Sequence, residues 1–143
     1  MKNLLALGIL LLLAGCQENV QPETIEQTEV ETVRNDHVID HNGEIENLEL
    51  LHQFLKDTGD NKQSSLELTR YTIEGAPIYW RVEYQEGQYN IEVDNREDNF
   101  GSQNIENYQC GKLNEDVTGS LTDYNFKSCE GGYEINLLSV TSD

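Results

Sequence analysis

The sequence predicts an α+β fold in which one N-terminal helix packs on an antiparallel β-meander of about five to six strands. Apolar residues recur at helical spacing over residues 48–57, and they alternate with polar residues over much of the chain that follows. The alternating segments are joined by short turns, which are typical of antiparallel neighbours.

Length and charge narrow the function classes. The chain has 143 residues and a formal net charge of −18. This length allows one domain with a core of its own. The negative charge excludes nucleic acid as a partner, because its phosphates require clustered Lys and Arg. It also argues against adsorption on anionic lipid.

The N-terminus has the layout of a secretory signal. Lys2 precedes an unbroken apolar run over residues 4–13, which is too short to span about 30 Å of hydrocarbon. Leu13-Ala14-Gly15-Cys16 resembles the bacterial lipobox. That motif implies removal of residues 1–15 and attachment of diacylglycerol to Cys16, with palmitate among the acyl chains. We therefore expect a protein anchored by lipid to the extracytoplasmic face of the cell membrane.

Residues 16–41 are expected to form an acidic, disordered tether that carries the lipidated Cys16. Apolar residues are scattered there, and Arg34 is the only Lys or Arg among many acids. A partner-binding acidic arm is the alternative. His37 and His41 would share one face of a helix, but the sequence places no third metal ligand beside them.

Residues 42–143 are expected to form the single globular domain. Its helix should cover residues 48–57, with the Asn47 side chain accepting a hydrogen bond at the N-cap and Gly59 ending the helix. A strand at 66–73 and a turn at 74–77 should follow. The register of that strand is ambiguous, because its apolar residues change parity along it.

A hairpin has the clearest pattern in the chain. A two-residue turn at Glu86-Gly87 pairs Tyr84 with Tyr89 and Trp80 with Val93, which places the alternating apolar residues on one face. Further strands are expected near residues 105–110, 121–129 and 133–140.

Cys110 and Cys129 remain once Cys16 is assigned to lipid. An even pair in an exported domain predicts a disulfide. Closing a loop of about 20 residues would contribute roughly 3 kcal/mol to stability. A catalytic thiol or a metal pair would need a partner residue that the sequence does not supply.

The candidate binding surface lies on the outward-facing side of the hairpin. It consists of Tyr79, Arg81 and Asp94, with Asp98 in the loop beyond. Carboxylates crowd residues 94–98, where they could collect Ca²⁺, although a polar turn explains them as well. The chain lacks the phosphate-loop, GxSxG and HExxH motifs. We therefore predict no catalytic residue, no resident metal and no cofactor.

Several segments resemble a small lipoprotein family of Bacillus-type Gram-positive bacteria, catalogued as domain of unknown function 4362. The matching residues are 42–45, 47–48, 54–55, 71–78, 94, 98, 100–101, 108–110, 124–129 and 137–140. The chain departs from the family at Ala76, where an Asp is expected, and at Glu97, where an Arg is expected. The resemblance implies the location and the domain boundaries, and it adds no mechanism.

The function expected from these observations is that of a binding or accessory module, not an enzyme, with an envelope or secreted protein as partner. One alternative is an inhibitor or immunity-type lipoprotein that blocks a basic enzyme or toxin, since complementary charge speeds such encounters. Another is an envelope hydrolase that uses Asp94 or Asp98, which would require a cleft that the sequence cannot place.

Overall fold

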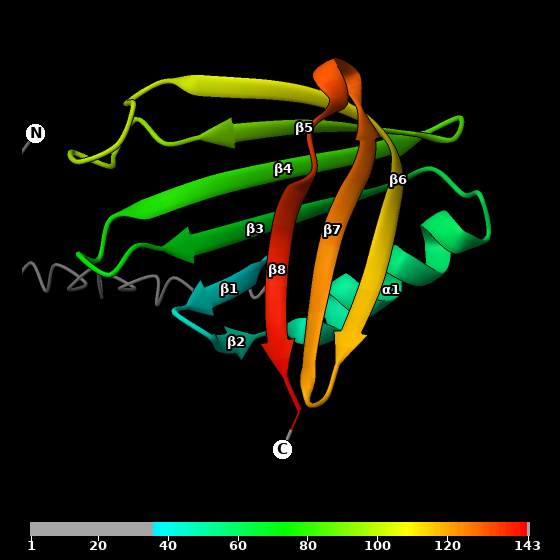
Figure 1. Cartoon of the computed structure of the whole chain (residues 1–143), viewed down its shortest axis with the longest axis horizontal. Helices are drawn as coiled ribbons and strands as arrows, with labels where there is room; N and C mark the ends of the chain where they lie inside the picture. Colours follow the sequence, from blue (N-terminus) through cyan, green and yellow to red (C-terminus); the bar gives the residue numbers. More distant parts are fainter. Residues whose placement is uncertain (1–35, 143) are drawn as a thin grey trace, which may run out of the picture. The chain divides into compact units, whose positions relative to one another are not determined.

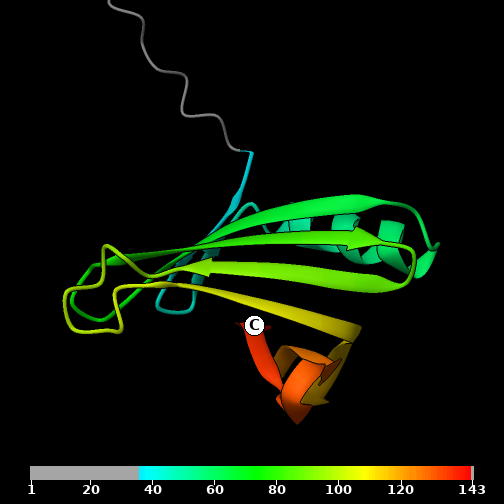
Figure 2. The same cartoon turned by 90° about the horizontal axis from the view of Figure 1, so that it is seen from above.

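A computed structural model describes residues 36–142. They form one eight-stranded sheet in the order β2-β1-β3-β4-β5-β6-β7-β8, which curls around a single α-helix (Figures 1 and 2). The elements are β1 (Val38–His41), β2 (Glu44–Glu46), α1 (Leu48–Gly59), β3 (Ser64–Tyr71), β4 (Pro77–Gln85), β5 (Gln88–Asp94), β6 (Ile105–Thr118), β7 (Leu121–Cys129), the short 3₁₀ turn η1 (Glu130–Gly132) and β8 (Ile135–Thr141).

The predicted fold class is wrong. The described chain is mostly strand, and its sheet is a curled, mixed half-barrel of eight strands rather than an antiparallel meander of five to six. Two short strands precede the helix and join the sheet, with β1 parallel to β3. The segment from β2 through α1 makes this crossover possible, because parallel neighbours require a long connection.

β1 lies within the residues predicted to be the tether, so the sheet begins before residue 42. The predictions for the signal peptide, Cys16 and most of the tether fall outside the described residues. Among residues 36–142, no helix is both long and apolar enough to cross a membrane.

The helix is confirmed, but its ends are made differently. Asn47 adopts a left-handed conformation (φ 57°) and makes no side-chain cap. The side-chain amide nitrogen of Asn47 instead donates to the backbone carbonyl oxygen of His37 at 2.9 Å. This bond links the start of the helix to the residue that precedes β1. Gly59 is the last helical residue, and the left-handed residue that follows is Asn61 (φ 56°).

The β4–β5 hairpin is confirmed in register, with Tyr84 opposite Tyr89 and Trp80 opposite Val93. Glu86 and Gly87 have φ of 53° and 83°. These are the left-handed conformations that a two-residue hairpin turn requires.

The C-terminal strands complete the curl. β7 has its predicted bounds, whereas β6 continues to Thr118, well beyond the expected end. The predicted disulfide joins Cys110 to Cys129, which are register partners on β6 and β7. A register shift in β8 opposite Tyr124/Asn125 lets the consecutive Leu137 and Leu138 both be buried.

The core fills the inner face of the curled sheet. Phe54 of α1 packs edge-on against Tyr89 of β5 (6.2 Å between ring centroids), and Tyr89 packs against Phe126 of β7 (5.4 Å). Arg70 lies at the margin of this core, with 32 % of its side chain exposed. It pairs with the buried Asp40 of β1 at 3.3 Å and donates to the carbonyl oxygens of Asn136 and Leu137. The outer face of β3–β6 is therefore free for polar side chains.

Candidate functional site

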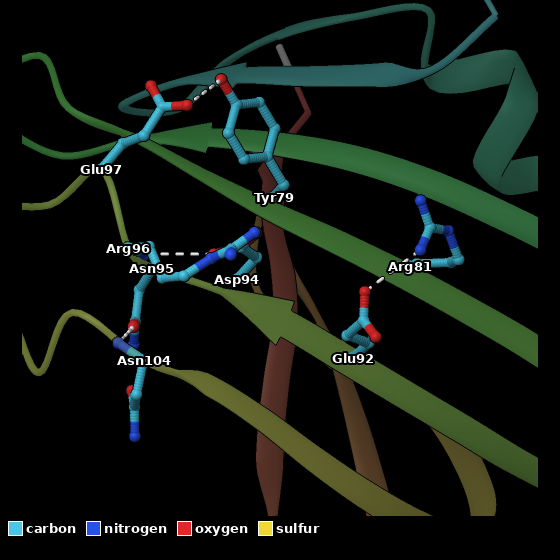
Figure 3. Close-up of polar contacts among 8 residues, drawn as sticks. All are labelled: Tyr79, Arg81, Glu92, Asp94, Asn95, Arg96, Glu97 and Asn104. Carbon is cyan, nitrogen blue, oxygen red and sulfur yellow. Dashed lines mark hydrogen bonds and ion pairs between the residues drawn. The ribbon is translucent and has the colours of Figure 1, made fainter.

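Three of the four predicted surface residues lie together on the outer face. Tyr79 is the register partner of Asp94, and Arg81 is the register partner of Glu92 (Figure 3). β3 adds Glu67, which lies opposite Arg81. One face thus gathers an aromatic hydroxyl, a guanidinium and several carboxylates from three neighbouring strands.

Two adjoining hollows follow this face, and we call them the outer hollows. The first, of about 260 Å³, is lined by His37, Glu67, Leu68, Thr69, Tyr79, Trp80, Arg81, Glu92 and Asp94. The second, of about 470 Å³, is lined by Arg81, Glu83, Asn90, Ile91, Glu92, Asn107, Tyr108, Gln109 and Glu130. Arg81 and Glu92 line both, so their ion pair marks the junction.

Arg81 is held between two acids. Its Nη1 lies 3.1 Å from Glu92 Oε1, and its Nε lies 3.5 Å from Glu67 Oε1. Two carboxylates share one guanidinium, and Glu83 adds a further exposed carboxylate nearby. The junction is consequently negative as well as ordered.

Asp94 closes one end of the outer hollows in a tight pair with Arg96. The guanidinium donates to both carboxylate oxygens, from Nε at 2.9 Å and from Nη2 at 2.7 Å. The Arg96 backbone N–H adds a third bond at 3.1 Å. These hydrogen bonds lower the pKa of Asp94 to about 2. Asp94 is therefore ionised at neutral pH.

Tyr79 supplies a neutral donor. Its side chain is 42 % exposed, and its hydroxyl donates to Glu97 Oε1 at 3.4 Å. Burial, followed by the nearby Glu97 charge, raises the pKa of Tyr79. The phenol stays protonated at neutral pH, with its O–H directed to Glu97 and its ring accessible to a ligand.

Asp98 is not brought into the outer hollows. It lies in the β5–β6 loop, where its Oδ1 accepts from the backbone N–H of Phe100 at 3.0 Å. Asn95 closes that loop by bonding Asn104 through its backbone and its side chain (Figure 3). The structure therefore gives Asp98 a role in shaping the loop.

The carboxylates of residues 94–98 do not converge. Asp94 pairs with Arg96, and Glu97 accepts a hydrogen bond from the Tyr79 hydroxyl. Asp98 accepts a hydrogen bond from a backbone N–H of its own turn. Within residues 36–142, no group of three or more His, Cys, Asp or Glu side chains could hold a metal ion. His37 and His41 do not share a helix: His37 precedes β1 and His41 ends it, and four residues of extended chain span about 13 Å.

Most of the residues described above fall in a segment that matches a known protein family. Residues 34–125 match the model described as Domain of unknown function (DUF4362). The chain belongs to this family. No curated protein and no solved structure matches it.

The DUF4362 match covers β1 through the first half of β7. It includes every residue that lines the outer hollows except Glu130, which belongs to η1. Cys129 and β8 lie beyond the matched residues. The outer hollows are thus built almost wholly from the family's own segment.

Sequence reasoning missed the contributions of His37, Glu67 and Thr69. Their strands were unrecognised or of ambiguous register, so their parity could not be assigned. β1 pairs in parallel with β3, with Ile39 opposite Thr69, and His37, just before β1, lines the first outer hollow together with Glu67. The available signal was the buried pair Leu66 and Leu68, which fixes the odd-numbered residues of β3 on the outer face.

Proposed function

We propose that this DUF4362 chain is a lipid-anchored extracytoplasmic lipoprotein that acts as a binding or accessory module and recognises a basic protein through the outer hollows. The observation that carries this proposal is the ordered, negatively charged face around Arg81, Glu92 and Tyr79. Its side chains are held by cross-strand bonds before any partner arrives, which reduces the ordering cost of binding.

The state of the acidic groups supports recognition rather than acid–base chemistry. The pKa of Asp94 is lowered to about 2 by its bonds to Arg96. A carboxyl that acts as a general acid near neutral pH needs a raised pKa. The proposal accordingly assigns no catalytic step to this face.

Charge supports a basic partner. The formal net charge is −18, and Glu83 and Glu130 present further carboxylates to the second outer hollow. Complementary charge would speed association and make it weaken with added salt. Tyr79 belongs to the residue types that commonly anchor protein interfaces.

The anchor rests on the Leu13-Ala14-Gly15-Cys16 motif. Replacing Cys16 with Ser removes the thiol that would take diacylglycerol. The variant should leave the membrane fraction, and metabolic labelling with palmitate should be lost. Equal membrane retention and labelling of Cys16→Ser and the natural chain would overturn the lipid anchor.

The binding role is tested by cross-linking and affinity capture from intact cells. Glu83→Lys places a positive charge in the second outer hollow, whereas Glu49→Lys makes the same change of charge on α1. We expect one basic envelope or secreted protein with the natural chain and with Glu49→Lys, and much less of it with Glu83→Lys. Capture unaffected by Glu83→Lys, or no captured protein, would overturn the proposal.

A second candidate is an inhibitor or immunity-type lipoprotein, which the excess of acids over cations favours. The same captured partner separates the two functions. A basic enzyme or toxin whose activity falls in proportion to bound lipoprotein would establish inhibition. A partner whose activity is unchanged or raised would leave the accessory role.

A further inference from the structure

We infer that a third hollow, formed where β6 and β8 begin, binds the guanidinium group of an arginine side chain on a polypeptide partner. This inference goes beyond the proposed function, because the hollow is a separate site from the outer hollows. The hollow has a volume of about 550 Å³ and is lined by Glu106, Tyr108, Tyr133, Glu134, Ile135 and Asn136. We call it the tyrosine hollow.

One tyrosine of the tyrosine hollow is exposed. Tyr133 is 64 % exposed, and its ring lies beside Gly131. Gly131 has φ 82°, a left-handed conformation that favours glycine. The ring of Tyr133 is thus accessible to a ligand.

The other tyrosine is fixed by a carboxylate. The Tyr108 hydroxyl donates to Glu106, and this bond is the main reason why the pKa of Tyr108 is raised. Tyr108 therefore remains a donor at neutral pH. Glu106 has further acceptor positions at the rim of the tyrosine hollow.

The carboxylates of the tyrosine hollow differ from those of the outer hollows in having no cationic partner. Among residues 36–142, neither Glu106 nor Glu134 forms an ion pair within 4.0 Å. Lys127 is near enough for Glu134 to raise its pKa, but its ammonium bonds Asp116 at 3.0 Å. Two carboxyl groups without a cationic partner therefore line the same hollow as two tyrosines.

This chemistry selects a guanidinium. Aromatic faces attract cations through the ring quadrupole, and arginine is the side chain that stacks most often in this way. Its planar fork also donates two parallel bonds to one carboxylate. Tyr108 is the register partner of the buried Ile91, so its side chain lies on the inner side of β6, on the opposite face from the outer hollows.

The probe is an acetylated, amidated pentaglycine peptide with its central residue replaced by arginine. Its matched controls carry citrulline, which is neutral and of similar shape, or lysine. The full chain, labelled with ¹⁵N and kept in detergent micelles, is titrated with each peptide and followed by NMR. We expect the arginine peptide to shift the amides of residues 106–108 and 131–136.

The variants make the assignment specific. Tyr133→Ala and Glu134→Gln should each lower the affinity for the arginine peptide roughly five-fold. Phe100→Ala, which removes an exposed ring that lines neither the tyrosine hollow nor the outer hollows, should leave its affinity unchanged. The lysine peptide should bind more weakly, and the citrulline peptide should give no shifts.

Several results would overturn the inference. They are equal binding of the citrulline or lysine peptide, shifts spread over all acidic surfaces, or unchanged affinity in Tyr133→Ala. Its failure is separable from that of the proposed function, which is tested by partner capture with Glu83→Lys. Partner capture that depends on Glu83, without arginine-peptide binding, would overturn the inference and leave the proposed function standing.

Discussion

Among single residues, Asp94 gives a direct electrostatic prediction. Its pKa is lowered from 3.8 to about 2, first by the Arg96 side chain and then by the Arg96 backbone. Because the folded pKa lies below the unfolded value, the interaction stabilises the fold fully above pH 3.8, and this contribution is lost as pH falls through about 2. In Arg96→Gln, the Asp94 carboxyl should titrate closer to 3.8. Carboxyl ¹³C NMR measures both midpoints.

Asp116 provides the internal control for that titration. Its pKa is lowered by Asn125 and Lys127, which do not contact Arg96. Arg96→Gln should therefore leave the Asp116 midpoint where it is. An unchanged Asp94 midpoint in the variant would contradict the assigned cause.

Arg70 and Arg81 form a contrasting pair of arginines. Asp40, the acid that Arg70 neutralises, is only 7 % exposed, whereas the partners of Arg81 are largely exposed. Arg70→Met leaves a buried carboxylate without its cation and should lower the free energy of unfolding by about 3 kcal/mol. Arg81→Met should cost less than about 1 kcal/mol.

Urea denaturation measures this difference, provided that the slope of each transition is unchanged. The Arg70→Met result also tests the link to β8, because Arg70 donates to the carbonyl oxygens of Asn136 and Leu137. Equal midpoints for the two variants would contradict a structural role for the Asp40–Arg70 pair.

Among the elements, the β4–β5 turn predicts a stabilising change. Glu86 is left-handed (φ 53°), a conformation that costs most residues free energy but suits asparagine. Glu86→Asn should therefore raise the free energy of unfolding by about 0.5–1 kcal/mol, and Gly87→Ala should lower it by about 1 kcal/mol or more. Thermal unfolding of both variants checks the signs. A lower midpoint for Glu86→Asn would contradict the turn assignment.

The disulfide gives the second prediction at this scale. Cys110 and Cys129 are separated by 19 positions and join β6 to β7. Replacing both with Ala should lower the free energy of unfolding by about 3 kcal/mol. In the presence of a reductant, the natural chain should have a free energy of unfolding close to that of the variant. Identical unfolding of the natural chain with and without reductant would show that the bond does not form in solution.

The sequence predicted those elements whose pattern is local. The hairpin register followed from period-two alternation on both sides of Glu86-Gly87, and the helix followed from its apolar stripe. β1 and β2 were missed because strands of four and three residues offer too little alternation. Their parallel pairing with β3 depends on distant residues, which no local pattern reports.

Two further differences have identifiable physical causes. Ile73 is not a strand residue but a turn residue, 91 % exposed, and the inward position on β3 is taken by Arg70. Because a cation stands at this inward position instead of an apolar side chain, the alternation along β3 could not be recognised from the sequence. In β8, the bulge makes Leu137 and Leu138 both face inward and so breaks the alternation on which strand prediction depends.

The candidate site was predictable to the same extent. Tyr79, Arg81 and Asp94 were found because the hairpin register fixes their parity. The position of Asp98 relative to the outer hollows could not be predicted, because loop residues do not alternate between two faces. The tyrosine hollow was invisible, since Tyr108 and Tyr133 are 25 positions apart in the sequence and meet only when the sheet curls.

For the molecule as a whole, the excess of negative charge affects the stability of the fold. A formal charge of −18 makes the compact state repel itself more strongly than the expanded unfolded chain. Exposed ion pairs such as Lys62–Asp60 oppose this, but each contributes little. Screening by salt should therefore remove more repulsion than attraction. The free energy of unfolding should rise, on the order of 1 kcal/mol, between low and physiological ionic strength.

A charge-reduced variant tests the cause of that rise. Glu74 and Glu86 are exposed and form no ion pair within the described residues. Glu74→Gln with Glu86→Gln should be more stable at low salt and should gain less from added NaCl. Urea unfolding over a salt series measures both effects. A stability that falls with salt would mean that the ion pairs outweigh the repulsion, and the excess charge would then cost the fold little.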